Sequence, residues 1–243
     1  FVYLKKKYQT SIKCFLVGCA VMFLFAFVLE QLVHCVVFGS SIGIGIQNNT
    51  LMYALYGGLM AGLFEETGRF LAMHCVLKKE QGNSYNALMY GAGHGGFEMF
   101  VILSLGMINN LIYAVMINLG QTRMLLEPLD DTAKAALQST FDALIQTPRW
   151  NFMISPLERA AAIIAQIGLS VIVWYAATGK KINGLLFILA IFLHAVMDAV
   201  SVLMSKSGVP LPVAEIVVWL FSIGIALIAG RVWKKNIHTN ELC

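Results

Sequence analysis

The sequence predicts an all-α protein, a polytopic transmembrane helix bundle of about six spans in a single integral domain, residues 1–243. Three observations predict this fold. Only 12% of the residues are charged, about half the share found in soluble domains. Hydrophobic residues make up 58% of the chain, and the mean hydropathy is +0.75. The apolar residues also gather in six runs, each long enough to cross a bilayer as a helix of about 20 residues.

The six apolar runs are expected to be helices, because a helix satisfies its own backbone hydrogen bonds in lipid. One further helix is expected upstream, since FVYLKKKY at residues 1–8 reads as the end of an apolar segment followed by a basic stop. The predicted spans lie at residues 14–38, 50–77, 84–106, 154–178, 182–205 and 211–233.

Two segments between the third and fourth runs are treated differently. Residues 107–120 are apolar but short for a span, so they are either an extension of the third run or an interfacial segment. Residues 121–150 form the main polar loop, in which apolar residues recur at helical spacing. This pattern predicts an amphipathic helix on the outer membrane surface, with Asp130 or Asp131 as its cap.

Lysine and arginine residues predict the orientation in the membrane. Lys206 is the lone basic residue in the short loop between the fifth and sixth runs. The positive-inside rule therefore predicts a cytoplasmic C-terminus, here in a bacterial cell membrane. Short basic clusters at the ends of apolar runs indicate topology and not nucleic-acid binding. The clusters on the predicted cytoplasmic side are Lys5, Lys6, Lys7, Lys13, Lys78, Lys79, Lys180, Lys181, Arg231, Lys234 and Lys235.

Three of the predicted spans carry sets of ionisable residues, found in GLFEETGRFLAM, GAGHGGFEMF and FLHAVMDAV. A charge near the centre of a membrane helix costs roughly 2.5–3.5 kcal/mol, so such residues are candidates for function. Glu65, His94 and His194 each lie 12 or 13 positions from the predicted cytoplasmic boundary of their run, which is about 18–20 Å along a helix. The candidates therefore share one layer of the bilayer. They are Glu65, Glu66, Arg69, His94, Glu98, His194 and Asp198.

The spacing of these residues suggests a metal site. His94 and Glu98 are four residues apart, as are His194 and Asp198, so each pair shares a helix face. Two imidazoles and two carboxylates at one point suit Zn²⁺, which can supply a hydroxide nucleophile near neutral pH.

The remaining charges suggest catalysis beside that metal. Glu65 is the expected general base, with Glu66 as an alternative base or ligand. Arg69 can pair with either glutamate or stabilise an oxyanion.

These motifs resemble the intramembrane metalloprotease superfamily that includes the type II CAAX prenyl endopeptidases and the PrsW-type proteases. Those families carry a double glutamate with a following basic residue, then an aromatic-x3-His or aromatic-x3-Glu, then a His-x3-Asp/Asn. The chain is most similar to the YhfC-type branch, in which a GHGG.E stretch is expected. The counterparts here are Glu65-Glu66-x2-Arg69, Tyr90-x3-His94 and His194-x3-Asp198.

The resemblance implies that a glutamate-activated water on zinc cleaves a peptide or membrane-protein substrate within the bilayer. The chain departs from the family pattern at two points. Arg69 follows the glutamate pair after two residues, where the prenyl endopeptidases have three, so its partner is open. Glu98 is an additional carboxylate that either binds the metal or orients His94.

Other interpretations of the polar layer stay open. Buried Glu, His and Asp residues also carry protons in a proton-coupled transporter, which would need a polar path across both leaflets. A non-catalytic membrane scaffold or receptor, such as the scaffold subunit of γ-secretase, would keep the layer for assembly and bind no metal. Glu65, Glu66 and Arg69 alone can also form a structural ion pair.

Two further charged pairs lie in the outer halves of their spans. Glu158 and Arg159 lie near the outer end of the fourth run, where interfacial capping or pairing is favoured over catalysis. Glu30 and His34 in the first run are four residues apart, and a packing or loop-contact role is favoured for them.

Overall fold

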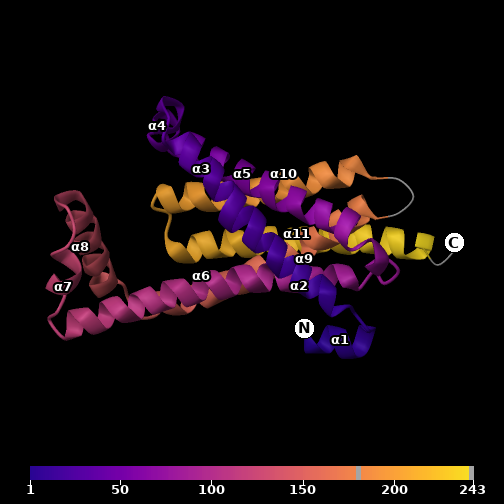
Figure 1. The fold of residues 1–243 in the computed structure, drawn as a ribbon, viewed down its shortest axis with the longest axis horizontal. Helices are drawn as coiled ribbons and strands as arrows, with labels where there is room; N and C mark the ends of the chain where they lie inside the picture. The colour runs from indigo at the N-terminus through magenta and orange to yellow at the C-terminus, as the bar shows by residue number, and fades with distance from the viewer. Residues whose placement is uncertain (179–181, 241–243) are drawn as a thin grey trace. The chain divides into compact units, whose positions relative to one another are not determined.

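The structure is a computed structural model that describes residues 1–178 and 182–240, with side chains up to Asn236. Lys180 and Lys181 of the predicted basic clusters lie outside the described residues. All regular elements of the described residues are helices joined by short turns, with no strand, in agreement with the predicted all-α fold (Figure 1).

The helices in the first part of the chain are α1 Val2–Tyr8, α2 Ile12–Met22, the π-helix η1 Phe23–Leu29, α3 Glu30–Phe38, α4 Ser41–Gln47, α5 Thr50–Leu71, the π-helix η2 Ala72–Val76 and the 3₁₀-helix η3 Lys78–Glu80. Those in the second part are α6 Asn86–Asn118, α7 Arg123–Leu126, α8 Asp131–Gln146, α9 Asn151–Ala177, α10 Gly184–Lys206 and α11 Leu211–Asn240.

Five helical stretches of the described chain are long and apolar enough to cross a membrane. The predicted run at 50–77 forms α5 and η2 but is not among the five, because Glu65, Glu66 and several glycines lower its hydropathy. The five stretches are Ile12–Phe38, Asn86–Asn118, Asn151–Ala177, Gly184–Lys206 and Leu211–Asn236.

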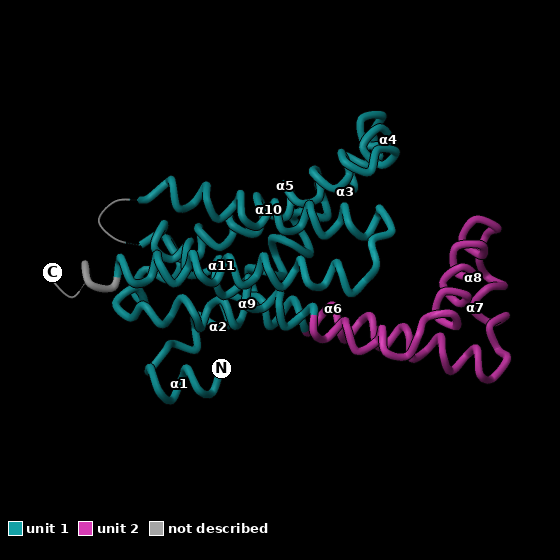
Figure 2. The backbone as a smooth tube through the Cα atoms, turned by 180° about the vertical axis from the view of Figure 1, so that it is seen from behind, with its two compact units in different colours: residues 1–99, 158–243 teal, residues 100–157 magenta. Residues whose placement is uncertain are grey.

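The chain divides into two compact units (Figure 2). Unit 1 comprises residues 1–99 and 158–243, and unit 2 comprises residues 100–157. The single domain expected over residues 1–243 stays a prediction.

Unit 2 contains the segments between the third and fourth predicted spans. Helix α6 continues to Asn118, so the interpretation of residues 107–120 as an extension of the third run is confirmed. The expected amphipathic helix is α8. Asp130 is its N-cap, because Asp130 Oδ1 accepts a hydrogen bond from the Ala133 amide at 2.9 Å. Phe141 of α8 is buried and packs edge-on against Tyr113, with ring centroids 5.3 Å apart. The position of α8 on the outer membrane surface stays a prediction.

Unit 1 holds α5 directly against α10. A Cβ at Gly58 would lie 2.3 Å from the Ala195 carbonyl oxygen, and one at Gly62 would lie 2.8 Å from that of Ile191. Only glycine fits at such distances, so the Gly-x3-Gly spacing lets the two backbones approach closely. This approach brings the charged residues of α5 beside His194 of α10.

Helix α9 is the central helix of the core. Of its most apolar 18-residue window, 72% is buried, against 22% or less in the other four membrane-length stretches. Large side chains from η2 and the residue after it, from α6 and from α9 fill the core toward the end of unit 1 where α9 ends and α6 begins. They include Met73, Leu77, Met89, Tyr90, Leu169 and Trp174, all 1% exposed or less.

Candidate active site

Helix α5 places three ionisable residues inside unit 1. Glu66 and Arg69 are fully buried, and Glu65 is 6% exposed. The spacing of three and four residues puts both glutamates within reach of the Arg69 guanidinium. Charges without water are costly unless they are paired, so the partners of each group determine what it can do.

Glu66 has both carboxylate oxygens engaged. Arg69 Nη1 donates to Glu66 Oε1 at 2.9 Å and to Oε2 at 3.1 Å. His194 Nδ1 of α10 also donates to Glu66 Oε1, at 2.6 Å. Glu66 therefore orients Arg69 and His194 and has little capacity left to accept a proton from a water molecule.

Glu65 is engaged on one oxygen only. Its Oε2 accepts hydrogen bonds from His94 Nε2 of α6 at 2.9 Å and from Gln166 Nε2 of α9 at 3.1 Å. Arg69 Nη2 lies 3.7 Å from the same oxygen. Oε1 lies 3.9 Å from His194 Nε2, beyond hydrogen-bond distance. Glu65 thus has one fixed oxygen and one that can accept a proton.

Gln166 joins the two sides of this layer, and the sequence analysis missed it. It is 3% exposed. Its Oε1 accepts from Arg69 Nη2 at 2.5 Å, and its Nε2 donates to Glu65 and to Glu98 Oε2, at 3.1 and 2.8 Å. Gln166 lies 14 positions before Lys180, about 21 Å along a helix, so the depth criterion would have found it if amides had been counted with the charges.

Glu98 is held by donors on both oxygens. Gln166 donates to Oε2, and Arg159 Nη1 donates to Oε1 at 3.1 Å. Arg159 also donates through Nη2 to Glu158 at 2.5 Å. The pairing that the sequence favoured for Glu158 and Arg159 is therefore present, and Arg159 additionally reaches into the site through Glu98.

A polar cavity of about 100 Å³ lies against these residues. Its walls come from α5, α6, α9, α10 and α11 and include Glu65, Gln166 and His194. Asp198 also lines it, with its Oδ2 3.5 Å from His194 Nε2 and its side chain 32% exposed. All seven residues that the sequence singled out therefore lie in one connected network around this cavity.

The four predicted metal ligands are placed differently within the network. His194 donates its Nδ1 proton to Glu66, which leaves Nε2 facing Glu65 and Asp198, as in metal-binding histidines whose other nitrogen bonds a carboxylate. His94 Nδ1 is buried and has no hydrogen-bond partner in the described chain. Glu98 contacts Gln166 and Arg159. These nitrogen and oxygen donors suit Zn²⁺ chemically, although no three His, Cys, Asp or Glu side chains of the described residues form a preassembled metal-binding group.

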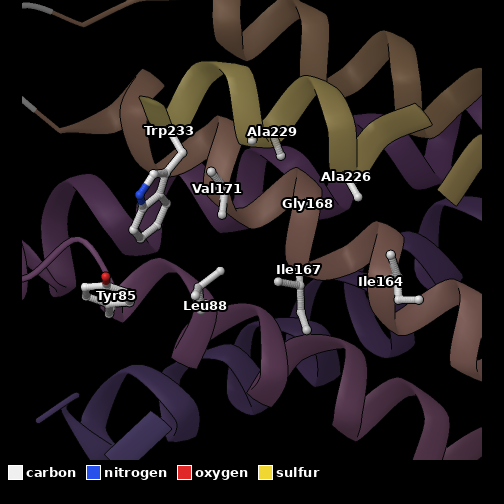
Figure 3. A pocket seen from close by; sticks show the side chains of 10 residues that line it. Tyr85, Leu88, Ile164, Ile167, Gly168, Val171, Ala226, Ala229 and Trp233 are labelled. Atoms are coloured by element: carbon white, nitrogen blue, oxygen red, sulfur yellow. The ribbon is translucent and has the colours of Figure 1, made fainter. Parts of the chain in front are cut away.

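Two other polar or hollow regions of unit 1 do not form part of the lining of this cavity. Glu30, also 6% exposed, accepts from His34 Nε2 at 3.2 Å, and His34 Nδ1 lies 2.9 Å from the Tyr56 hydroxyl. An apolar pocket of about 340 Å³ lies between α6, α9 and α11, where Leu88, Ile167 and Trp233 face it (Figure 3). Its lining contains no acidic or basic side chain, so it offers no hydrolytic chemistry.

Comparisons with known proteins found one family and one related protein. The sequence profile of the YhfC intramembrane metalloprotease family matches residues 1–218. The chain is 37% identical over 206 residues to the uncharacterized membrane protein YhfC of Bacillus subtilis (strain 168). The match covers 84% of this chain and 78% of that relative. No solved structure matches the chain.

Proposed function

The chain belongs to the YhfC intramembrane metalloprotease family, and on that premise we propose that it hydrolyses a peptide bond within the membrane with a water molecule activated by Glu65. One observation carries the proposal. Glu65 is a buried carboxylate with Oε2 held by His94 and Gln166, and the residue lines a polar cavity. A base fixed in this way is oriented before the substrate binds.

In the proposed reaction, Glu65 transfers the protons and its neighbours hold it in place. Glu65 Oε1 accepts a proton as the water oxygen attacks the carbonyl carbon of the scissile bond. The carbon–nitrogen bond then breaks, and Glu65 returns the proton to the leaving amine. His94 keeps the carboxylate in place through its Nε2 proton. Arg69 already contacts Glu66 and Gln166, so it holds the two glutamates in position and is a poor candidate for oxyanion binding.

His94, His194 and Asp198 would hold a divalent metal, which we take to be zinc, with Glu98 as an alternative ligand. When bound, the metal acidifies water and polarises the substrate carbonyl. Because Gln166 and Arg159 occupy both oxygens of Glu98, an orienting role for Glu98 agrees better with its contacts than direct ligation.

The closed inner end of the cavity supports a hydrolase over a transporter. A carrier needs a polar path that reaches both membrane surfaces. Beyond Glu66 and His94, however, the described core is filled by Tyr90, Leu169 and Trp174. A scaffold would have no need for a carboxylate that faces a cavity.

The test combines metal analysis with cleavage. Wild-type protein and the His94→Ala/His194→Ala variant are purified without chelators, and the metal content is measured by mass spectrometry. Both are then reconstituted with a library of quenched fluorescent peptides that carry a membrane-spanning segment. We expect about one zinc per wild-type chain and cleavage of part of the library, both lost in the variant. Neither metal nor cleavage in the wild type would contradict the proposal and favour a scaffold.

A further inference from the structure

The cavity at Glu65 has an exposed end and a buried end. The exposed fraction differs among the charged side chains that line it. It is 38% for Glu158, 32% for Asp198, 16% for Arg159 and 14% for Glu98, against 7% for Glu65 and 2% for His194. Charged side chains that face hydrocarbon are costly, so this graded exposure indicates a water-filled passage and not a lipid-facing surface.

Two helices show where the passage leads. From His194 to Ser201, which also lines the cavity, α10 rises by seven residues or about 10 Å. From Gln166 back to Glu158, α9 covers eight residues or about 12 Å in the same direction. Both lead to the end of unit 1 where α10 connects to α11, opposite the end where α11 ends (Figure 1).

The opposite end of the site is closed. One turn beyond Gln166 on α9, Ser170 is fully buried, and its hydroxyl donates to the Gln166 carbonyl at 2.7 Å. On α6, Tyr90 lies one turn before His94, and neither is exposed. Met73, Leu169 and Trp174 fill the space between the helices there.

We propose that the Glu65 site opens only at the α10–α11 end of unit 1, so that it acts on polypeptide segments that approach from the extracytoplasmic side. The side assignment follows from the basic clusters at Lys78, Lys79, Lys234 and Lys235, which lie at the other end of the spans, while Lys206 is the lone basic residue in the short loop between the fifth and sixth predicted spans. The action on polypeptide rests on the proposed function, whereas the position of the opening does not depend on it.

The charge of the passage adds a preference for cationic molecules. Glu98, Glu158 and Asp198 line it outside Glu65, and Arg159 is the lone arginine or lysine in the lining. A cleft lined mainly by one sign of charge concentrates the opposite charge. A positively charged substrate segment is therefore expected to enter more readily than a negatively charged one.

The test is cysteine labelling in intact cells that express the full chain without its five native cysteines. Ser201→Cys places a thiol in the passage, and Ser170→Cys places one in the closed region. The two are matched, because each serine hydroxyl donates to the carbonyl four residues earlier in its own helix. Lys206→Cys and Lys79→Cys mark the two ends of the spans. The reagents are membrane-impermeant methanethiosulfonates that carry either a trimethylammonium or a sulfonate group.

We expect Ser201→Cys and Lys206→Cys to react from outside the cell, and Ser170→Cys and Lys79→Cys to stay unlabelled. We also compare the ratio of the cationic to the anionic labelling rate at the two positions. We expect this ratio to be about tenfold higher at Ser201→Cys than at Lys206→Cys. An unreactive Ser201→Cys beside a reactive Lys206→Cys would overturn the proposal, as would labelling of Ser170→Cys.

A second measurement guards against a cysteine-free chain that does not fold. Ser201→Cys is then made with the native cysteines present, and modification is read by mass spectrometry of the peptide that contains residue 201. If Ser201→Cys is labelled only when the reagent also reaches Lys79→Cys on the inside of the cell, the extracytoplasmic approach is refuted. The labelling needs no substrate, so a chain that cleaves nothing but labels as expected would refute the proposed function and leave the opening in place.

Discussion

Two buried glutamates in unit 1 resemble each other closely and have very different surroundings. Glu30 and Glu65 are each 6% exposed, and each accepts a hydrogen bond from a histidine. The partner of Glu30 is His34 in the next turn of its own helical stretch, and Tyr56 completes a small local cluster. The partner of Glu65 lies on another helix, and residues from α9 and α10 join it.

The difference shows what turns a tolerated polar pair into a candidate site. The pair at Glu30 uses one helix and a neighbouring tyrosine for its hydrogen bonds, and it is linked to Glu65, His194 and Asp198 through charge alone. The group around Glu65 draws on four helices, contains a buried arginine and lies against a polar cavity. Burial and a histidine partner are common to both, whereas convergence of several helices on a cavity distinguishes Glu65.

The largest effect on folding is expected from Arg69→Met. Arg69 is fully buried among Glu65, Glu66 and Gln166, so its loss leaves buried carboxylates without their cation. Breaking such a pair typically costs about 3–5 kcal/mol. Unfolding in mixed detergent–SDS micelles would measure the loss of stability. His34→Ala, which removes the histidine partner of Glu30, is the matched variant. Arg69→Met combined with Glu66→Gln should recover part of the loss, and no recovery would contradict the assigned pairing.

Gln166→Leu is expected to lower cleavage by about 10–100-fold, the usual effect of losing a residue that orients a ligand or base. The side chain keeps its approximate volume but loses the donors to Glu65 and Glu98. The measurement is kcat and KM on whichever library peptide the wild type cleaves. A fall in kcat with KM unchanged would fit a positioning role. Tyr56→Phe, which removes the hydroxyl near His34, serves as the control and should leave both constants as they are.

Gly58→Ala should destabilise the fold by about 1–3 kcal/mol, the usual cost of overpacking. The added Cβ would meet the Ala195 carbonyl oxygen and would push α5 away from α10. Gly57→Ala is the matched control, because a Cβ there has nothing within 4 Å. Thermal denaturation in detergent would compare the two variants. Equal melting temperatures would show that the close approach of α5 and α10 does not limit stability.

The smallest effect is expected from Tyr56→Phe on stability. It removes one hydrogen bond to His34 near Glu30, which contributes about 0.5–1.5 kcal/mol. The same micelle unfolding experiment would resolve it against the wild type. A loss as large as that of Arg69→Met would mean that the cluster at Glu30 is as important to the fold as the one at Glu65.

The sequence predicted the helices and the polar layer because both depend on local pattern and depth. Glu65, His94 and His194 were placed at one level by counting residues along their runs, and they do contact one another through a single network. The rotation of each helix about its axis could not be predicted. This rotation determines which side chains meet. His94 pairs with Glu65, His194 pairs with Glu66, and Glu98 contacts Arg159 instead of a histidine.

Gln166 was missed because only ionisable residues were counted within the spans. An uncharged amide in a membrane helix is less costly than a charge, so it attracts less notice in a sequence. Its role depends on three partners from two other helices, α5 and α6, and no spacing within α9 shows them.

The most direct test of the central claim compares Glu65→Gln with Glu30→Gln on one cleaved peptide. Both changes remove a carboxylate of equal burial and keep the side-chain volume. If Glu65 activates water, Glu65→Gln should lower kcat by about 10²–10⁴-fold, while Glu30→Gln, which removes only a charge near the site, should have a much smaller effect. Wild-type turnover by Glu65→Gln, with the protein folded and monodisperse, would contradict the assignment of Glu65 as the base.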